Sequence, residues 1–164
     1  MIFGPPPFWK RSRGDATLID RTAGTNIGNM TSQAGLAAVF DGITDQNGTS
    51  SAAAASGDNG WAGKTLAAPT AIDRVVIYGA NDQGYVNGNN PSVEIRLYGK
   101  NGAAPSSSTD GTLLGTITFT DTATTDPRTI TSTDNLTAYD HVFVSIIWTS
   151  NAKRLAEMEI YGWQ

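Results

Sequence analysis

Five segments of the chain alternate between apolar and polar residues, and no segment keeps a helical period over a useful length. They are residues 72–78, 93–98, 113–120, 139–148 and 155–161. Because successive side chains of a strand point to opposite faces, a period of two predicts strands with one buried face. Gly, Asn, Ser and Thr dominate the stretches between them, and these residues favour turns. The pattern predicts an all-β fold, a jelly-roll β-sandwich.

The core of this sandwich is predicted from the inward positions of the same segments, which share one face of each strand. The expected core residues are Val75, Ile77, Val93, Ile95, Leu97, Ile117, Phe119, Val142, Val144, Ile146, Met158 and Ile160.

The charge balance and composition exclude several classes of protein. The net charge of −4 argues against nucleic acid as a partner, because phosphate binding needs a basic face. No stretch reaches the roughly 20 apolar residues of a membrane span, so we expect no membrane insertion. The chain has no cysteine, which excludes disulfides and thiolate metal sites.

The first 35 residues differ from the rest, so we divide the chain into an extended N-terminal arm with an irregular lead-in (1–35) and a sandwich (36–164). The lead-in is expected to hold at most one short strand. The three consecutive prolines of the arm favour an extended polyproline II conformation. It is either a disordered tail or an arm that docks on a partner subunit or a second copy of the chain. Its docking residues would be Phe3, Pro5, Pro6, Pro7, Phe8, Trp9, Lys10 and Arg11.

Six segments, taken in order, carry a resemblance to one family. They are AVFDGITD (38–45), GWAGKTLAAPTAIDRVVIYGAND (60–82), VEIRLYGKNG (93–102), Leu114–Asp121, AYDHVFVSI (138–146) and LAEMEIYG (155–162). Together they resemble the discoidin domain, also called the coagulation-factor type C domain, over residues 36 to 162. Two features depart from the family: Thr65-Leu66-Ala67 stands where Asp-Leu-Gly is usual, and the cysteines of extracellular animal members are absent.

This resemblance implies a galactose-binding-like jelly roll, the fold of family 32 carbohydrate-binding modules, with Trp61 packed in the core. It also implies a structural calcium ion at the positions that match Asp41 and Glu157. The residues add Asp45, which follows Asp41 in a turn whose oxygens suit calcium. The alternative is that Asp41-Gly42 is a turn closed by its own side chain and that Glu157 is a solvated strand residue.

Two loops carry the groups that bind sugars, namely planar aromatics for C–H faces and amide, carboxylate or cationic groups for hydroxyl pairs. In the resembled family the corresponding loops gather at one end of the sandwich. Tyr85 is expected to be exposed at a polar loop tip, although it can instead fold over the sheet, and Trp148 can instead be a core residue. The expected ligand-binding residues are Asn81, Asp82, Tyr85, Asn87, Trp148, Asn151, Lys153 and Arg154.

Catalysis is disfavoured by the scarcity of reactive side chains. The single histidine, His141, lies within a strand pattern and is interpreted as an outward-facing or hydrogen-bonded strand residue. Without cysteine or a second partner it offers no triad. Glu157 and Glu159 share one strand end, whereas a glycosidase needs two carboxylates across a cleft. We therefore expect no enzyme.

These observations predict a non-catalytic module that binds cell-surface glycans. Residues 1–13 run from apolar to basic, the reverse of a secretory signal, so we expect a virion component released by lysis, such as a bacteriophage or gene-transfer-agent attachment protein. One alternative is an assembly or decoration protein of such a particle, joined to other virion subunits by the arm. Another is an extracellular module of a larger protein. Lipid binding is disfavoured because the loops lack apolar spikes.

Overall fold

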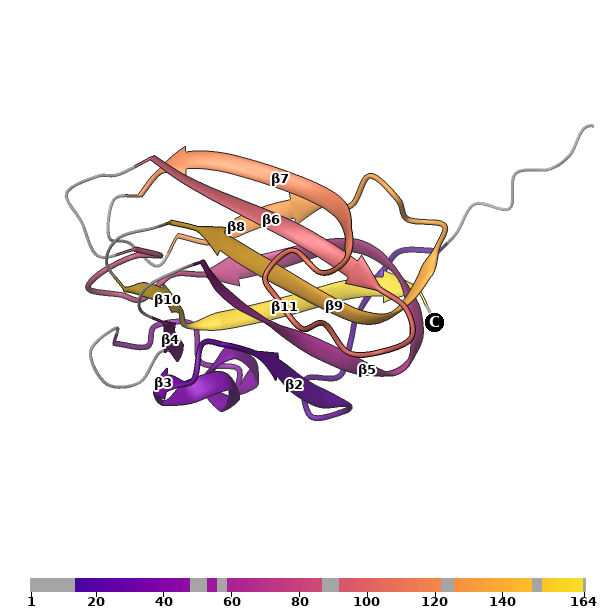
Figure 1. Ribbon diagram of the computed structural model, residues 1–164, viewed down its shortest axis with the longest axis horizontal. Coiled ribbons are helices and arrows are strands. Elements are labelled where there is room, and N and C mark those ends of the chain that lie inside the picture. The colour runs from indigo at the N-terminus through magenta and orange to yellow at the C-terminus, as the bar shows by residue number, and fades with distance from the viewer. Residues whose placement is uncertain are drawn as a thin grey trace, which may run out of the picture.

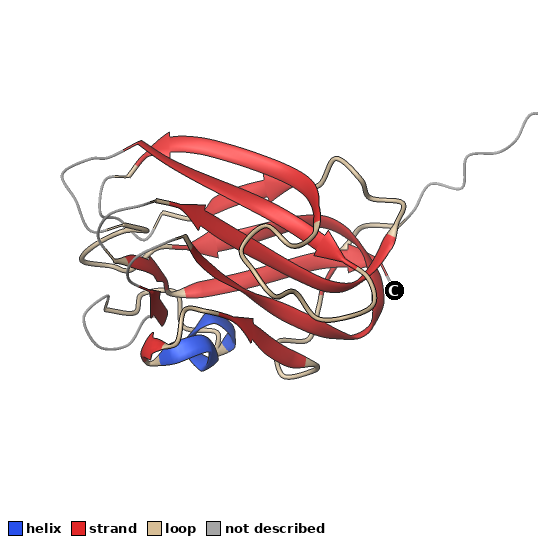
Figure 2. Cartoon of the chain, in the orientation of Figure 1, coloured by secondary structure: helices blue, strands red, loops and turns tan. Residues whose placement is uncertain are grey.

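Strands make up most of the described structure, and its one helix is a short 3-10 helix (Figure 2). The computed structural model describes residues 14–47, 53–55, 59–86, 92–121, 126–148 and 152–163. The elements are β1 (Thr17–Leu18), β2 (Thr25–Gly28), β3 (Ser32–Gln33), η1 (Gly35–Phe40), β4 (Ala53–Ala55), β5 (Gly60–Tyr78), β6 (Ser92–Lys100), β7 (Thr112–Thr120), β8 (Arg128–Thr131), β9 (Ala138–Ile147), β10 (Lys153–Leu155) and β11 (Glu157–Trp163). The predicted all-β class is confirmed.

The long strand β5 organises the fold because it contributes to both layers of the sandwich (Figure 1). Its first part pairs with β2 and β9, and its second part pairs with β11 and β8, all antiparallel. The register between β5 and β9 shifts between Thr65 and Thr70, where the strand passes from one layer to the other. Pro69 lies in this interval, where its missing N–H interrupts no ladder.

The strand order shows how one curled sheet closes on itself. It runs β1-β11-β5-β9-β6-β7, with β2 and β8 added to β5, while β10, β4 and β3 form a small separate sheet. The carbonyl of Leu114 in β7 accepts a hydrogen bond from Thr133 N–H (2.6 Å), just after β8, so the two layers meet at that side. The result is a β-sandwich whose apolar faces enclose one main core.

The predicted core register is confirmed. Ten of the twelve predicted core side chains are at most 3% exposed, and the other two, Ile117 and Phe119, pack against the core while staying partly exposed. These two lie on β7, which ends the strand order and pairs only with β6, so one flank of each side chain lacks a neighbouring strand. The alternation of apolar residues therefore predicted these strand segments and their inward faces, although β5 begins at Gly60, twelve residues before its predicted segment.

The lead-in is more ordered than predicted, which is a correction. β1 pairs with β11 and β2 pairs with the first part of β5, so residues 17–28 belong to the sandwich. Ile19 and Met30 are buried in the main core. These strands were not predicted because segments of two to four residues are too short to show a period. Residues 1–13 lie outside the described part of the chain.

The described elements contain no helix with the length and hydropathy that a membrane span requires.

Candidate functional site

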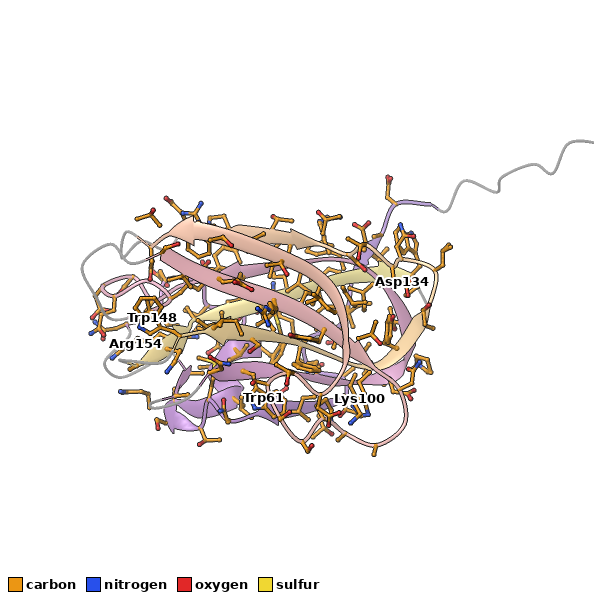
Figure 3. The ribbon with its side chains drawn as sticks, turned by 45° about the horizontal axis from the view of Figure 1, so that its top comes forward. Trp61, Lys100, Asp134, Trp148 and Arg154 are labelled. Atoms are coloured by element: carbon orange, nitrogen blue, oxygen red, sulfur yellow. The ribbon has the colours of Figure 1, made fainter. Side chains whose placement is uncertain are left out.

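One end of the sandwich gathers most of the described residues that the sequence assigned to ligand binding. β9 ends and β10 begins there, and Figure 3 places Trp148 and Arg154 at this end, far from Asp134 at the other. We call it the loop end and define its described part as Asn59, residues 81–86, Trp148 and residues 152–154. The structure thus brings two separate predicted loops to one place.

Trp148 supplies an aromatic ring with a free donor at the loop end. The side chain packs against the main core, as the alternative of a core residue expected, and part of the ring stays exposed. Its backbone N–H donates to Asn59 Oδ1 (3.1 Å). Its indole N–H is buried and, in the structure as described, has no hydrogen-bond partner. A buried donor without a partner is costly, and the described residues supply no acceptor for this one.

Lys153 and Arg154 are cations held in place by β10. Lys153 is fully buried, and a Cβ at Gly60 would lie 2.9 Å from the Lys153 Cβ, so glycine permits this approach. Arg154 is also buried, and its backbone N–H donates to the Tyr85 carbonyl (2.8 Å). Burial lowers the pKa of Arg154 and the charge of Asp82 raises it. The guanidinium stays charged at neutral pH and gives the loop end a fixed cation.

Asn81 and Asp82 lie exposed at the start of the 81–86 turn. Asn81 is fixed twice, because its backbone N–H donates to the Gln46 carbonyl (3.0 Å) and its Nδ2 donates to the Asp45 carbonyl (2.7 Å). Asp82 accepts a long hydrogen bond from Gln83 Nε2 (3.4 Å). Both side chains therefore present polar atoms to solvent from a turn with a set conformation.

Tyr85 is a correction, because the expected exposed ring is buried. The side chain is 1% exposed, its hydroxyl donates to the Ile77 carbonyl (2.8 Å), and its ring packs edge-on against Phe119. Burial raises the pKa of its phenol well above the usual value. Tyr85 lies inward because Asp121 Oδ2 accepts the backbone N–H groups of Tyr85 and Val86 at 2.8 Å each and so holds the turn against the sandwich.

Two residues of this region, Asn59 and Asp121, were not among those predicted. Asp121 directly follows the predicted segment 113–120, which is the only signal that the sequence offers for it, and Asn59 lies in a polar stretch that carries none. The predicted ligand residues Asn87 and Asn151, and the whole arm from Phe3 to Arg11, lie outside the described residues.

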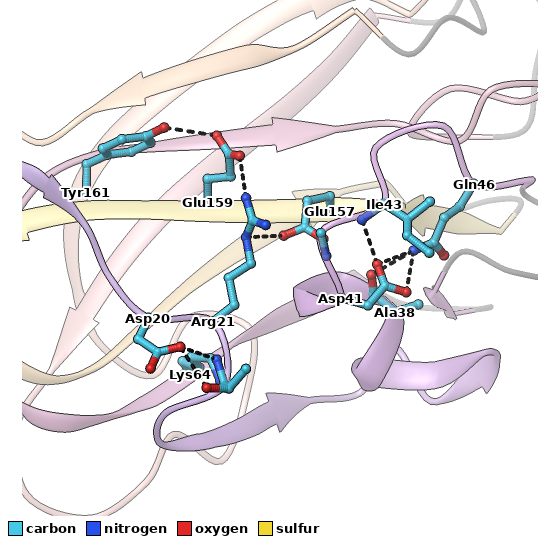
Figure 4. A network of polar contacts seen from close by, with 12 residues as sticks. Asp20, Arg21, Ala38, Asp41, Ile43, Gln46, Lys64, Glu157, Glu159 and Tyr161 are labelled. Carbon is cyan, nitrogen blue, oxygen red and sulfur yellow. Dashed lines mark hydrogen bonds and ion pairs between the residues drawn. The ribbon is translucent and has the colours of Figure 1, made fainter.

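The predicted calcium site lies on the turn after η1 (Figure 4). Glu157 is fully buried there, and its Oε2 accepts the Gly42 backbone N–H (2.8 Å). The Arg21 guanidinium lies between two carboxylates, with Nε 3.4 Å from Glu157 Oε1 and Nη2 2.7 Å from Glu159 Oε1. Burial raises the pKa of Glu157 to about 7, although the Gly42 hydrogen bond and Arg21 lower it.

The residues of this turn do not fit a calcium ion as they stand. Gln46 Nε2 donates to both carboxylate oxygens of Asp41 (2.8 and 2.9 Å), and Ile43 N–H donates to one of them. Asp45 points its backbone carbonyl at Asn81 instead. Calcium needs six to eight oxygen ligands, whereas N–H donors and a guanidinium already bind these carboxylates. Nowhere in the described ranges do three or more acidic, histidine or cysteine side chains gather as metal ligands.

His141 has a structural role that agrees with its interpretation. It is 4% exposed, its Nδ1 lies 2.8 Å from Thr65 Oγ1, and its Nε2 lies 2.8 Å from the Gly102 carbonyl. Both ring nitrogens are therefore hydrogen-bonded within the protein. The loop end itself offers an indole, amides, cations and the Asp82 carboxylate as groups for non-covalent binding.

Comparison with solved structures identifies the fold. A fucolectin from striped bass (Morone saxatilis) serum has a TM-score of 0.69 at 15% identity, covering 90% of this chain and 50% of that chain. A family 32 carbohydrate-binding module of C. perfringens NanJ in complex with galactose has a TM-score of 0.66 at 12% identity, covering 89% of this chain and 98% of that one. The fold is a galactose-binding-like β-sandwich.

A third galactose-binding-like structure, the F5/8 type C domain of a Bacteroides fragilis protein, has a TM-score of 0.65 at 18% identity. It covers 93% of this chain and 99% of that one. The chain spans only about half of the striped bass lectin chain. No family model matches the sequence, and no curated protein matches it. The likeness to the discoidin fold expected from the sequence is therefore supported by shape.

Proposed function

We propose that this chain is a non-catalytic carbohydrate-binding module and that its sugar site is the loop end. The observation that carries the proposal is Trp148, a partly exposed aromatic ring whose buried indole N–H lacks a partner in the described structure. An indole covers the C–H face of a sugar, and its N–H donates to a hydroxyl. Arg154 and Asn81 add groups that bind hydroxyl pairs.

The structural neighbours support this class of ligand. The NanJ module was solved with galactose, and the striped bass protein is named a fucolectin. Both share the galactose-binding-like sandwich with this chain. Asn81, Asp82 and Trp148 lie on loops next to strands, as ligand-binding residues commonly do.

Glycan-array binding by the wild type, followed by titration of the best glycan, tests the proposal. Trp148→Phe keeps a ring against the core but removes the indole N–H, so we expect affinity to fall about 3- to 10-fold. Trp163→Phe is the matched control, because Trp163 lies on the last strand and its indole donates to Gly14 instead. Absence of any glycan ligand, or equal affinity of wild type and Trp148→Phe, would contradict the proposal.

For the biological setting, we propose a host-attachment role on the surface of a phage-like particle, with residues 1–13 docking to the particle. Its support is the composition of the arm, where three prolines, three aromatics and three cations stand together. The alternative is an assembly or decoration role without sugar binding. Deleting residues 1–13 tests whether the arm docks or is an idle tail. A variant that folds but no longer assembles supports docking, and a variant that assembles normally contradicts docking.

A further inference from the structure

The face of β5, β6 and β9 that points away from the main core carries a second aromatic cluster. Trp61, Tyr98 and Phe143 form it, with Ile27 at its margin. The Tyr98 and Phe143 rings stack with centroids 5.2 Å apart, and Trp61 meets Phe143 edge-on at 5.3 Å. Trp61 is 8% exposed, so its predicted burial is confirmed, but it lies in this separate cluster and not in the main core.

The loop between β6 and β7, residues 101–111, covers this cluster and is fixed at its base. His141 is hydrogen-bonded to the Gly102 carbonyl, and the Gly102 N–H donates to Asp140 Oδ2 (2.8 Å). Asn101 Nδ2 donates to the Ala138 carbonyl (3.1 Å). The loop therefore leaves β6 in one set direction and returns over the sheet.

A second set of contacts fixes the tip of the loop. Asp110 Oδ2 accepts Lys100 Nζ (2.6 Å), the Ser106 N–H (2.8 Å) and the Ser106 hydroxyl (2.9 Å). These contacts lower the pKa of Asp110 to about 2, with the Lys100 hydrogen bond contributing most. The segment 106–108 is thus held in place by a carboxylate that stays charged over the physiological range.

The end of β2 forms the opposite wall. Asn29 is bound to β5 through both backbone and side chain, because its N–H donates to the Trp61 carbonyl (3.0 Å) and its Oδ1 accepts the Trp61 N–H (2.8 Å). Its Nδ2 donates to the Asn59 carbonyl (3.1 Å). Gly28 has φ +143, and a Cβ there would lie 2.3 Å from the Trp61 carbonyl oxygen. Only glycine lets this wall approach β5 so closely.

Between the two walls lies an open groove of about 490 Å³, a volume within the range of small-molecule sites. Its lining is Gly28, Asn29, Asn59, Trp61 and Ser106 to Ser108. None of these side chains is charged, so the groove has no ion-pair partner for a phosphate, a carboxylate or a cation. It offers hydroxyls, amides and the edge of an indole, which are the groups that bind neutral sugars.

We propose that this groove is a second saccharide-binding site, centred on Trp61 rather than on Trp148, sharing only Asn59 with the loop end, and selective for neutral sugars. Its walls are fixed by the hydrogen bonds described above, so a ligand pays little to order them. Two weak sites on one domain would engage a multivalent glycan together, and the second binding event would gain from a high effective concentration.

Indole resonances read the two sites independently in one titration. The ¹⁵N-labelled protein is titrated with galactose, fucose, glucose, mannose and N-acetylglucosamine to about 50 mM, since single-site sugar affinities can be millimolar. Trp61 reports the groove and Trp148 reports the loop end, and the variants Trp61→Phe and Trp148→Phe assign the two signals. We expect at least one sugar to shift the Trp61 signal saturably.

Ser107→Tyr fills the groove from an exposed position, and Ala104→Tyr is the matched control, because Ala104 is exposed on the same loop but does not line the groove. We expect the first variant to lose the Trp61 shift and the second to keep it. Shifts of Trp148 alone, or an equal Trp61 shift in both variants, would overturn the groove site. A saturable Trp61 shift without a Trp148 shift would support the groove while contradicting the loop-end proposal.

Discussion

The turn around Glu157 and the loop end around Trp148 both place polar groups at the margin of the core, but the two regions differ in the partners that these groups have. At the turn, Gly42, Arg21 and Gln46 bring a donor or a cation to the carboxylates of Glu157 and Asp41, although Glu157 Oε1 and Arg21 Nε, 3.4 Å apart, form an ion pair without a hydrogen bond. At the loop end, the indole N–H of Trp148 has no partner within the described structure. Charge pairing holds the turn together, whereas at the loop end a partly exposed ring stands beside an unpaired donor and is available to a ligand.

The largest effect should come from Asp121, a satisfied group that shapes the loop end. Asp121→Ala leaves the N–H groups of Tyr85 and Val86 buried without an acceptor, and each such group costs about 1–3 kcal/mol. We expect the free energy of unfolding to fall by about 2–5 kcal/mol in urea titrations. Asp82→Ala, in the same region but exposed, should change it by less than about 0.5 kcal/mol. Equal effects would show that Asp121 does not hold the turn.

The next largest effect concerns pH and the buried Glu157. Its pKa is raised to about 7 in the folded protein from an ordinary value of 4.5, so the folded state binds the proton more tightly. This contribution to stability is complete below pH 4.5 and is lost as pH rises through about 7. The contribution of this proton to the free energy of unfolding amounts to about 3 kcal/mol, at roughly 1.4 kcal/mol per pKa unit. Glu157→Gln should flatten this part of the pH profile in urea titrations, and an unchanged slope would assign it to other groups.

A smaller effect is expected from Arg21→Gln. This change leaves Glu157 without its cation, and removing one partner of a buried pair usually costs 3–5 kcal/mol. Because the Arg21 side chain is 30% exposed, water screens the pair, and we expect the free energy of unfolding to fall by about 1–3 kcal/mol. Arg74→Gln removes a surface pair with Asp73 and should cost less than about 1 kcal/mol. If the two variants have the same stability, Arg21 does not stabilise the turn.

Calcium gives the smallest effect and the clearest test of the turn. The family resemblance predicts that calcium binds Asp41 and Glu157, and a ligand of the native state must raise the melting temperature. The donor contacts in this structure predict no change. Melting curves in millimolar calcium and in chelator decide between binding and no binding. A higher melting temperature with calcium would show that the ion displaces the contacts of Arg21 and Gln46 with these carboxylates.

The strands were predictable because their signal is local. Val93 to Leu97 and Val142 to Ile146 alternate cleanly, and the structure buries the faces that this alternation assigns. The polar contacts were not predictable, because their partners lie far apart in sequence. Arg21 meets Glu159 across 138 positions, and Asp121 holds Tyr85 across 36. A tyrosine in a polar loop looks exposed until the distant carboxylate that draws it inward is known.

The pairing of β1 with β11 has a practical consequence. It sets Thr17 opposite Gly162, and the indole of Trp163 donates to the Gly14 carbonyl (2.6 Å). The first and last described residues therefore lie together, at the end of the sandwich away from β4 and β10 (Figure 1). A short linker can join them for circular permutation, with new termini opened in an exposed loop. A tag or surface tether placed there leaves the loop end facing outward, which suits immobilised binding assays.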